Sequence, residues 1–205
     1  MHIAILTFEG FNELDSLVAF GILNRVKRPE WRVSIACPSP RVRSMNGVVI
    51  EANINLRETS AADAVIVGSG VQTRDVVKDS SLMADLKLNP SRQLVGAQCS
   101  GTLILAKLGL LAGVSACTDV TTKPWVEEAG VSVLDQPFFA KGNIATAGGC
   151  LASQYLAAWV IAKLADIDSA KRALHYIAPV GEKDEYVSRA MRNITPYLAQ
   201  ENAAA

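Results

Sequence analysis

A cysteine at the end of an apolar run is the residue best placed to do chemistry in this sequence. Residues 94–102 read LVGAQCSGT, so a short β-prone run ends at Cys99 and a run rich in Leu, Ile and Ala follows at once. A side chain held at such a strand-to-helix turn resembles the nucleophile elbow, with cysteine in place of serine. The N–H groups that open a helix carry partial positive charge, and we expect them to favour the thiolate of Cys99.

The other thiols are less well placed. Cys150 follows Gly148 and Gly149 and opens a long apolar stretch, so it is the rival nucleophile, although the two glycines suit close backbone approach to a neighbouring site. We expect Cys37 and Cys117 to be packing residues, with Cys117 near the site. No C-x-x-C spacing occurs, which argues against zinc and against a disulfide framework, so we expect no metal and no cofactor.

Backbone donors for a developing negative charge are expected in the loop Gly68-Ser69-Gly70. Small residues after a strand let main-chain amides face such a charge, as an oxyanion hole requires. The alternative is an ordinary glycine turn before a helix. We expect Gly70 to supply one main-chain donor and the amide of Ser100 to supply the second.

Acidic residues are the remaining candidates for proton transfer. Asp15 and Glu13 open an expected helix, and from spacing alone Asp15 suits either the helix dipole or acid–base work. Asp119 stands where a general base could lie, or it is a loop or capping residue. The chain has two histidines, His2 and His175, and neither is placed to pair with a thiol, which disfavours a Cys-His dyad.

Apolar, β-branched runs alternate with longer amphipathic stretches, which is typical of parallel strands joined by helices. We therefore predict an α/β fold with a doubly wound, mostly parallel sheet flanked by helices, flavodoxin-like, in a single domain over 1–205. Short runs at 48–50 and 138–140 are hairpin arms or edge additions. Expected strands cover 2–7, 32–37, 64–67, 93–98 and 144–147, and expected helices cover 12–25, 73–87, 100–108, 121–129, 149–165 and 169–177.

Ligands of such sheets bind beyond the carboxyl ends of the strands. An expected strand over 114–117 leads into Thr118 and Asp119, and the strand over 144–147 leads into Gly148 and Gly149, so these four residues are candidates for the pocket. Five aromatic residues could wall the pocket or pack in the core: Phe11, Trp125, Phe138, Phe139 and Tyr155.

Composition narrows the class of protein. Half of the 205 residues are hydrophobic, and 20 basic residues balance 20 acidic ones, which disfavours disorder and a nucleic-acid partner. No apolar stretch reaches membrane length, because Lys107 interrupts the longest one, and the first residues lack the pattern of a signal peptide. We expect no membrane partner, a cytoplasmic location and reduced thiols.

Taken together, these motifs resemble the ThiJ/PfpI superfamily, whose fold is similar to that of class I glutamine amidotransferases. The resemblance covers about 1–180 and is carried by the segments 8–15, 68–70, 98–101 and 147–149. Asp15, and the run CSGTL that starts at Cys99, are most similar to the isonitrile hydratase branch, which carries an aspartate where other branches carry glutamate.

The resemblance implies specific roles. Cys99 would be the nucleophile and Asp15 its acidic partner, Ser100 would take the position of the branch's hydroxyl residue, and Gly70 would supply a main-chain donor. Asp119 occupies the place where the superfamily often has histidine, and Gly68-Ser69-Gly70 replaces the usual Pro-Gly-Gly loop. A homodimer is implied as well.

The implied activity is that of a cysteine-dependent hydratase, a lyase that acts on a small molecule. Cys99 would attack the terminal carbon of an isonitrile, Asp15 would donate a proton and later help to activate water, and the thioimidate would release an N-substituted formamide. A non-catalytic redox sensor or stress protein is the alternative of another class, because an exposed thiol of low pKa is easily oxidised. A glyoxalase-like or amidase-like activity of the same superfamily is a further alternative.

Overall fold

The structure, a computed structural model, describes residues 1–198. Its centre is a seven-stranded sheet in the order β5-β2-β1-β6-β7-β9-β8, parallel throughout except for the antiparallel pair β8–β9 at one edge. The strands of this sheet are β1 (His2–Leu6), β2 (Arg32–Cys37), β5 (Ile54–Asn55), β6 (Ala64–Val67), β7 (Leu94–Gln98), β8 (Phe138–Lys141) and β9 (Ile144–Ala147).

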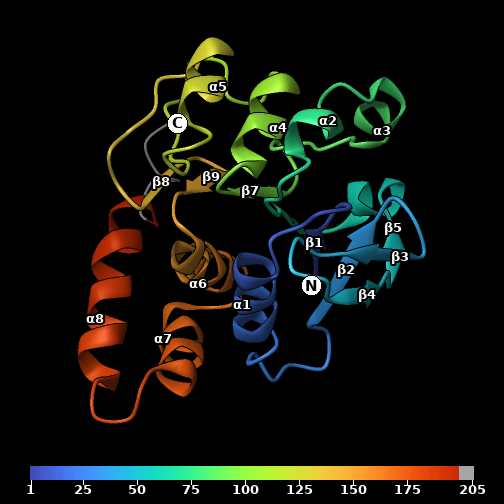
Figure 1. Cartoon of the computed structure of the whole chain (residues 1–205). Helices are drawn as coiled ribbons and strands as arrows, with labels where there is room; N and C mark the ends of the chain where they lie inside the picture. The colour runs from blue at the N-terminus through green and yellow to red at the C-terminus, as the bar shows by residue number, and fades with distance from the viewer. Residues whose placement is uncertain (199–205) are drawn as a thin grey trace.

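Helices cover both faces of the sheet, because the central strands are apolar on both sides (Figure 1). In β1, Ile3 and Ile5 pack into the core beneath one helical layer, whereas Ala4 and Leu6 pack into the core on the opposite face, as the two-residue period of a strand requires. The first layer contains α1 (Glu13–Leu23), α6 (Ser153–Leu164), α7 (Ile167–Ile177) and α8 (Lys183–Ile194). The opposite layer contains α4 (Gly101–Lys107) and α5 (Lys123–Glu128), with α2 (Thr73–Val76) against α4 and α3 (Ser80–Asp85) farther out.

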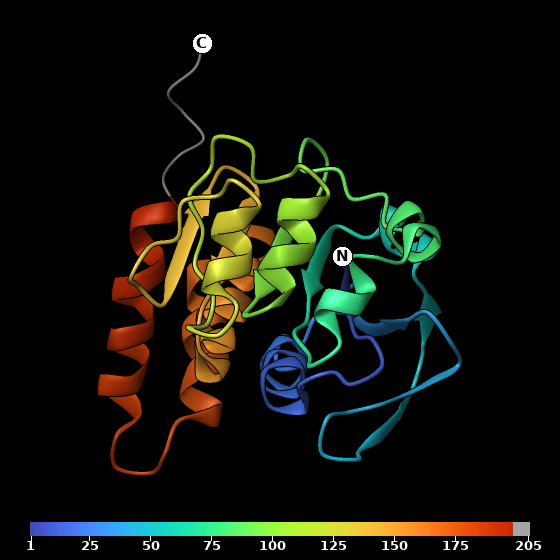
Figure 2. The same ribbon diagram turned by 45° about the horizontal axis from the view of Figure 1, so that its top comes forward.

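The first layer is centred on α6, which packs against α1, α7 and α8. Trp159 of α6 is fully buried and lies against Phe138 of the edge strand, with ring centroids 6.4 Å apart. Figure 2 shows α8 as the outermost helix of this layer, beside α7. Among residues 1–198, no helix combines the length and the apolar character needed to cross a bilayer.

The predicted fold class is confirmed, and three predicted elements need correction. The expected helix over 73–87 is two short helices, α2 and α3, because the carboxylate of Asp79 accepts the N–H groups of Ser81 and Leu82 and starts a new helix there. The helix expected from 149 begins with the 3₁₀ turn η2 (Cys150–Ala152), since Gly149 has a φ of +88°. The expected strand over 114–117 contributes only an isolated bridge between Ala116 and Val133.

Two short runs predicted as hairpin arms or edge additions are confirmed, whereas other elements were not predicted from the sequence. A small separate sheet pairs β3 (Arg41–Arg43) with β4 (Val49–Glu51), so the run at 48–50 is a hairpin arm, and the run at 138–140 is the edge strand β8. Helix α8 was missed although its apolar residues are spaced for one buried face. Two 3₁₀ turns complete the described chain: η1 (Arg57–Ala61) and η3 (Thr195–Tyr197).

Strand order decides which loops meet at the site. β1, β6, β7 and β9 are consecutive neighbours in the sheet and run parallel, so their carboxyl ends lie along one edge. The last residues are in register, with Leu6 opposite Val67 and Gln98 opposite Ala147. The loops that follow these four strands therefore converge.

Candidate active site

Cys99 occupies a strained elbow between β7 and α4. Its φ is +44°, and among residues 1–198 it is the only non-glycine residue with a positive φ. A side chain in this left-handed conformation costs roughly 1–2 kcal/mol, so the surrounding contacts must hold it. The N–H of Cys99 donates to the carbonyl of Ala147 at 2.8 Å, and the hydroxyl of Thr118 donates to the Cys99 carbonyl at 2.8 Å.

Gly101, two positions after Cys99, explains why α4 can start so close to β6. A Cβ on Gly101 would lie 2.5 Å from the carbonyl oxygen of Val67 and 2.8 Å from that of Gly68. Only glycine allows this approach without displacing the backbone of β6. The short glycine-containing elbow thus fixes the position of the Cys99 sulfur.

Asp15 reaches the same place from the first turn of α1. The side chain of Asn12 caps this helix by accepting the N–H of Leu14, and the Asn12 N–H donates to the carbonyl of Ser69, which ties the helix to the loop after β6. The carboxylate of Asp15 is 1% exposed. It accepts a 2.5 Å hydrogen bond from the hydroxyl of Ser69 and a 3.4 Å one from that of Ser16.

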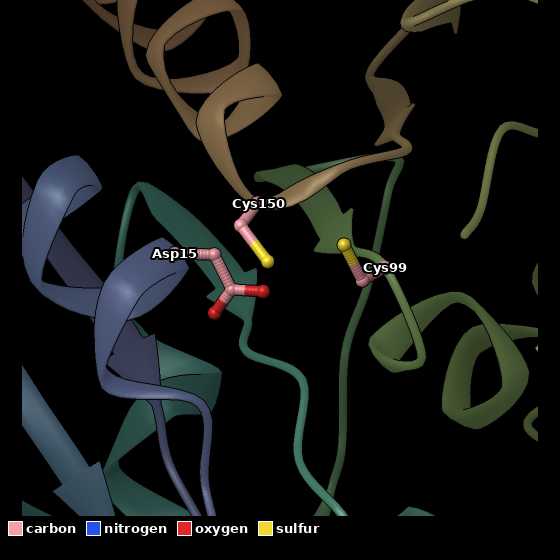
Figure 3. Close-up of side chains that lie close together, drawn as sticks. All are labelled: Asp15, Cys99 and Cys150. Atoms are coloured by element: carbon pink, nitrogen blue, oxygen red, sulfur yellow. The ribbon is translucent and has the colours of Figure 1, made fainter. Parts of the chain in front are cut away.

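The structure brings Asp15, Cys99 and Cys150 together. One carboxylate oxygen and the two sulfur atoms all lie within 4.8 Å of one another. Figure 3 shows the three side chains projecting toward one another from α1, from the end of β7 and from the start of η2. Residues that are 51 to 135 positions apart in the chain therefore form one cluster.

Burial sets the protonation of the acid. It raises the pKa of Asp15 from 3.8 to about 6, while hydrogen bonding from Ser69, Ser16 and the Cys99 thiol lowers it in part. A carboxyl group with a pKa near neutrality can both accept and donate a proton under ordinary conditions.

The thiol departs from the sequence-based expectation of a stabilised thiolate. Burial raises the pKa of Cys99 well above its ordinary value, and the negative charges of Asp15 and Cys150 raise it further. The side-chain amide of Gln98, 3.5 Å from the sulfur, lowers it only in part. Desolvation therefore outweighs the helix opening, and Cys99 rests as a protonated thiol.

The expected main-chain donors are arranged differently from the sequence-based picture. The N–H of Gly70 donates to the hydroxyl oxygen of Ser100 at 3.1 Å, and that hydroxyl also contacts Thr73 Oγ1 at 2.8 Å. The Ser100 side chain thus ties the elbow to the loop after β6. Within residues 1–198 the N–H of Ser100 itself has no hydrogen-bond acceptor, so it is the better candidate for an oxyanion donor.

A cavity of about 400 Å³ opens onto the cluster. Cys99 and Cys150 line it, although Cys99 is only 4% exposed, and Trp125 forms part of its wall. The lining also includes these residues: Asn12, Met45, Ser69, Gly70, Val71, Ser100, Asp119, Thr121, Thr122 and Gly149.

The remaining predicted pocket residues support the site rather than face its centre. Asp119 lines the cavity, but its carboxylate accepts the N–H groups of Thr121 and Thr122 at 3.0 Å and so shapes the turn before α5. A Cβ on Gly148 would lie 2.3 Å from the carbonyl oxygen of Thr118, which explains the glycine by close packing.

The histidines and the other aromatic residues lie elsewhere. The His2 ring is hydrogen-bonded to Ser34 at the far end of β1, and His175 is on α7, so neither lines the cavity. Phe11, Phe138 and Tyr155 are buried in the core, and Phe139 packs on Tyr197, whereas Cys37 is buried against Thr7 and Cys117 is fully buried.

Two polar residues that contact the cluster were missed from the sequence. Asn12 donates from Nδ2 to the sulfur of Cys150 at 3.1 Å, and Gln98 donates from Nε2 to the carbonyl of Gly149 at 2.9 Å as well as approaching Cys99. From the sequence, Asn12 was only the first residue of the expected helix over 12–25, and Gln98 was only the last residue of the expected strand over 93–98. Their second roles depend on contacts over 138 and 51 positions, which spacing does not reveal.

Comparison of the chain with known protein families gives a match over most of its length. The model of the DJ-1/PfpI family matches residues 1–163. No match was found among curated protein sequences.

Solved structures share the fold at low identity. DJ-1 from Schizosaccharomyces pombe is 17% identical with a TM-score of 0.73, and the match covers 87% of this chain and 100% of that one. A ThiJ/PfpI family protein from Pseudomonas syringae is 18% identical with a TM-score of 0.76, covering 97% and 89%. Drosophila melanogaster DJ-1beta is 21% identical with a TM-score of 0.75, covering 86% and 96%.

Proposed function

The chain belongs to the DJ-1/PfpI family, and from that premise we propose that it is a cysteine-dependent hydratase that converts small isonitriles to N-substituted formamides. Cys99 is the nucleophile and Asp15 is the acid–base residue. The observation that carries the proposal is the buried carboxyl group of Asp15, which has a pKa of about 6. It lies beside the Cys99 thiol, and Cys99 lines a cavity.

The first step needs a base because Cys99 rests as a thiol. Ionised Asp15 accepts the thiol proton as the sulfur attacks the terminal carbon of the isonitrile, and the protonated acid then donates that proton to the same carbon. One S–H bond breaks, and one S–C and one C–H bond form. The product is a thioimidate on Cys99, and Asp15 is again ionised.

Water completes the reaction at the same carbon. The oxygen of a water molecule adds to the thioimidate carbon while Asp15 accepts a proton from that water. Asp15 then passes this proton to the thioimidate nitrogen. The tetrahedral species then collapses: the C–S bond breaks, the hydroxyl proton returns to the sulfur through Asp15, and the formamide leaves. The N–H of Ser100, which has no hydrogen-bond acceptor within residues 1–198, would stabilise negative charge during this step.

The test is a substrate panel. Isonitriles, α-oxoaldehydes and simple amides are offered to the wild-type protein and to the Cys99→Ala and Asp15→Asn variants in metal-free buffer, and products are identified by mass spectrometry. We expect formamide formation from isonitriles, none with Cys99→Ala, and a loss of about 100- to 10,000-fold with Asp15→Asn, the usual contribution of a general acid–base group.

A Cys37→Ser variant is the matched control, because Cys37 is a buried cysteine hydrogen-bonded to Thr7 outside the cavity. It should keep the wild-type rate. Turnover that survives in Cys99→Ala would refute the proposal, and turnover of α-oxoaldehydes or amides alone would replace it with the glyoxalase-like or amidase-like alternative.

The redox-sensor alternative is less well supported by the same site. Thiolates oxidise faster than thiols, and both the burial and the raised pKa of Cys99 reduce the thiolate fraction.

A further inference from the structure

The cluster of Asp15, Cys99 and Cys150 is also a set of metal ligands. Its carboxylate oxygen and two sulfur atoms lie within 4.8 Å of one another (Figure 3). In a tetrahedral zinc site, Zn–S distances of ~2.3 Å place two sulfur ligands ~3.8 Å apart. The two sulfur atoms therefore need to approach by about 1 Å at most, and the carboxylate oxygen and a sulfur by about 1.3 Å at most, to share one cation.

Amide and hydroxyl groups of the protein donate to the sulfur and carboxylate atoms of this cluster. The Asn12 amide donates to the sulfur of Cys150 at 3.1 Å, and the Gln98 amide approaches the sulfur of Cys99 at 3.5 Å. The hydroxyls of Ser69 and Ser16 donate to the two carboxylate oxygens. Such donors orient ligands and favour their deprotonated form, as outer-shell partners do in metal sites.

Positive charge is what the cluster lacks. Among the described residues that line the cavity, none carries a basic side chain. The charges that act on Cys99 come from Asp15, Cys150 and Asp119, and all of them disfavour its ionised form. A divalent cation would convert this mutual repulsion into attraction, and sulfur ligands select a thiophilic one.

The cavity provides a route for the cation and room for a further ligand. Cys99 and Cys150 both line it, and Cys150 is partly exposed. The side-chain oxygen of Gln98 is buried without a hydrogen-bond partner within residues 1–198, and it belongs to the amide that approaches Cys99. A water molecule bound to the cation would be a donor that this oxygen can accept.

We propose that Cys99, Cys150 and Asp15 form a binding site for a thiophilic divalent cation of the zinc class, assembled by the fold from segments that show no metal-binding spacing. Binding breaks two S–H bonds, forms two metal–sulfur bonds and one metal–oxygen bond to the Asp15 carboxylate, and releases two protons. The cation takes the sulfur lone pair that would attack substrate, so the metal-loaded form is inactive in the proposed hydration. Cys150 therefore contributes a ligand rather than a second nucleophile.

The experiment titrates the reduced, metal-free protein with Co²⁺ and then displaces it with Zn²⁺. Sulfur-to-cobalt charge-transfer absorption reports the number of thiolate ligands, and no substrate is involved, so the result does not depend on the hydratase proposal. We expect wild-type protein to show two thiolates, and Cys150→Ser and Cys99→Ser to show one. Removing an outer-shell partner typically costs 10- to 100-fold in affinity, so losing the Cys150 ligand should cost about 100-fold or more.

The buried Cys37 again provides the control, and Cys37→Ser should bind Co²⁺ as the wild type does. A Cys150→Ala variant, compared by its unfolding midpoint, excludes misfolding as the cause of lost binding. The proposal is overturned if the wild-type cobalt complex lacks thiolate absorption, or if folded Cys150→Ser or Cys150→Ala protein binds Zn²⁺ as tightly as the wild type.

Discussion

At the scale of single residues, the proposed mechanism transfers one proton between two buried groups. The Asp15 carboxyl group has its pKa raised to about 6 and the Cys99 thiol has its pKa raised further above neutrality. Near pH 7 the pair therefore holds one proton, on sulfur, with an ionised base beside it. A permanent thiolate is not required, because the base acts only when substrate is present.

The pH dependence of kcat/KM follows from this arrangement. Protonated Asp15 cannot accept the thiol proton, so we expect kcat/KM for an isonitrile to rise with pH through about 6 and then to level off. Steady-state rates in metal-free buffers test this. A rate that falls as pH rises through this range would show that Asp15 acts first as an acid.

The same carboxyl group makes stability depend on pH. Its pKa is higher in the folded chain, about 6, than the ordinary value of 3.8, so its favourable contribution is complete below the lower value and is lost as pH rises through about 6. This difference in pKa corresponds to about 3 kcal/mol. The free energy of unfolding of wild type minus that of Asp15→Asn should fall by about this amount between about pH 4 and about pH 8, as measured by urea denaturation.

At the scale of elements, close backbone packing around the elbow fixes the nucleophile. Gly101 lies against the end of β6, and Gly148 lies against Thr118. Ser100 joins the elbow to the loop after β6 through Gly70 and Thr73. The strained φ of Cys99 is maintained by these contacts rather than by its own preference.

Substitution at one of these glycines tests the packing. Gly101→Ala places a methyl group 2.5 Å from the Val67 carbonyl oxygen, so we expect a loss of about 1–3 kcal/mol in the free energy of unfolding and a fall in kcat. Gly21→Ala in α1 is the control, because nothing lies within 4 Å of the added Cβ, and it should stabilise the protein by about 0.5–1 kcal/mol. Equal effects of the two changes would contradict this explanation.

Substitutions at Asp119 distinguish a structural role of its carboxylate from a catalytic one. Its carboxylate accepts two backbone N–H groups before α5, so Asp119→Ala should cost about 1 kcal/mol of stability, whereas Asp119→Asn keeps an acceptor and should cost less. We expect kcat/KM to change by less than about tenfold in either variant, which is below the usual contribution of a general base. A larger loss in Asp119→Asn would assign it a proton-transfer role.

Much of the fold was predictable because apolar runs indicate strands and helices, and small residues indicate turns, from the local sequence alone. The parallel strands, the elbow at Cys99 and the DJ-1/PfpI (ThiJ/PfpI) assignment were predicted from the sequence and are confirmed. The raised pKa of Cys99 was missed because helix geometry is local, whereas burial depends on the whole fold. Pocket positions after both strands were predicted, but the direct approach of the Cys150 sulfur to Cys99 and Asp15 was missed, since 51 positions separate the two cysteines.

At the scale of the whole molecule, exposed apolar side chains lie on elements next to the loop that joins β1 to α1. Leu14 and Leu17 lie on α1, Val49 lies on β4, and the backbone of this loop is hydrogen-bonded to the β3–β4 hairpin and to Val71. Exposed apolar groups that cluster are typical of a surface that binds another protein.

We propose that two copies of the chain pair through this surface. Sedimentation should give about twice the 21.9 kDa chain mass. Leu17→Glu combined with Val49→Glu should reduce the mass to that of a monomer, while Val180→Glu, at an exposed position between α7 and α8, should leave it unchanged. A monomeric wild-type protein would contradict the proposal.

Covalent trapping tests the proposed chemistry most directly. Wild-type protein mixed with excess isonitrile and quenched in acid should gain the mass of one isonitrile, and digestion should place it on the peptide that contains Cys99. The slower Asp15→Asn variant should carry the same adduct at a lower rate, and Cys99→Ala should carry none. An adduct on Cys150, or formamide release without any adduct at Cys99, would contradict the account.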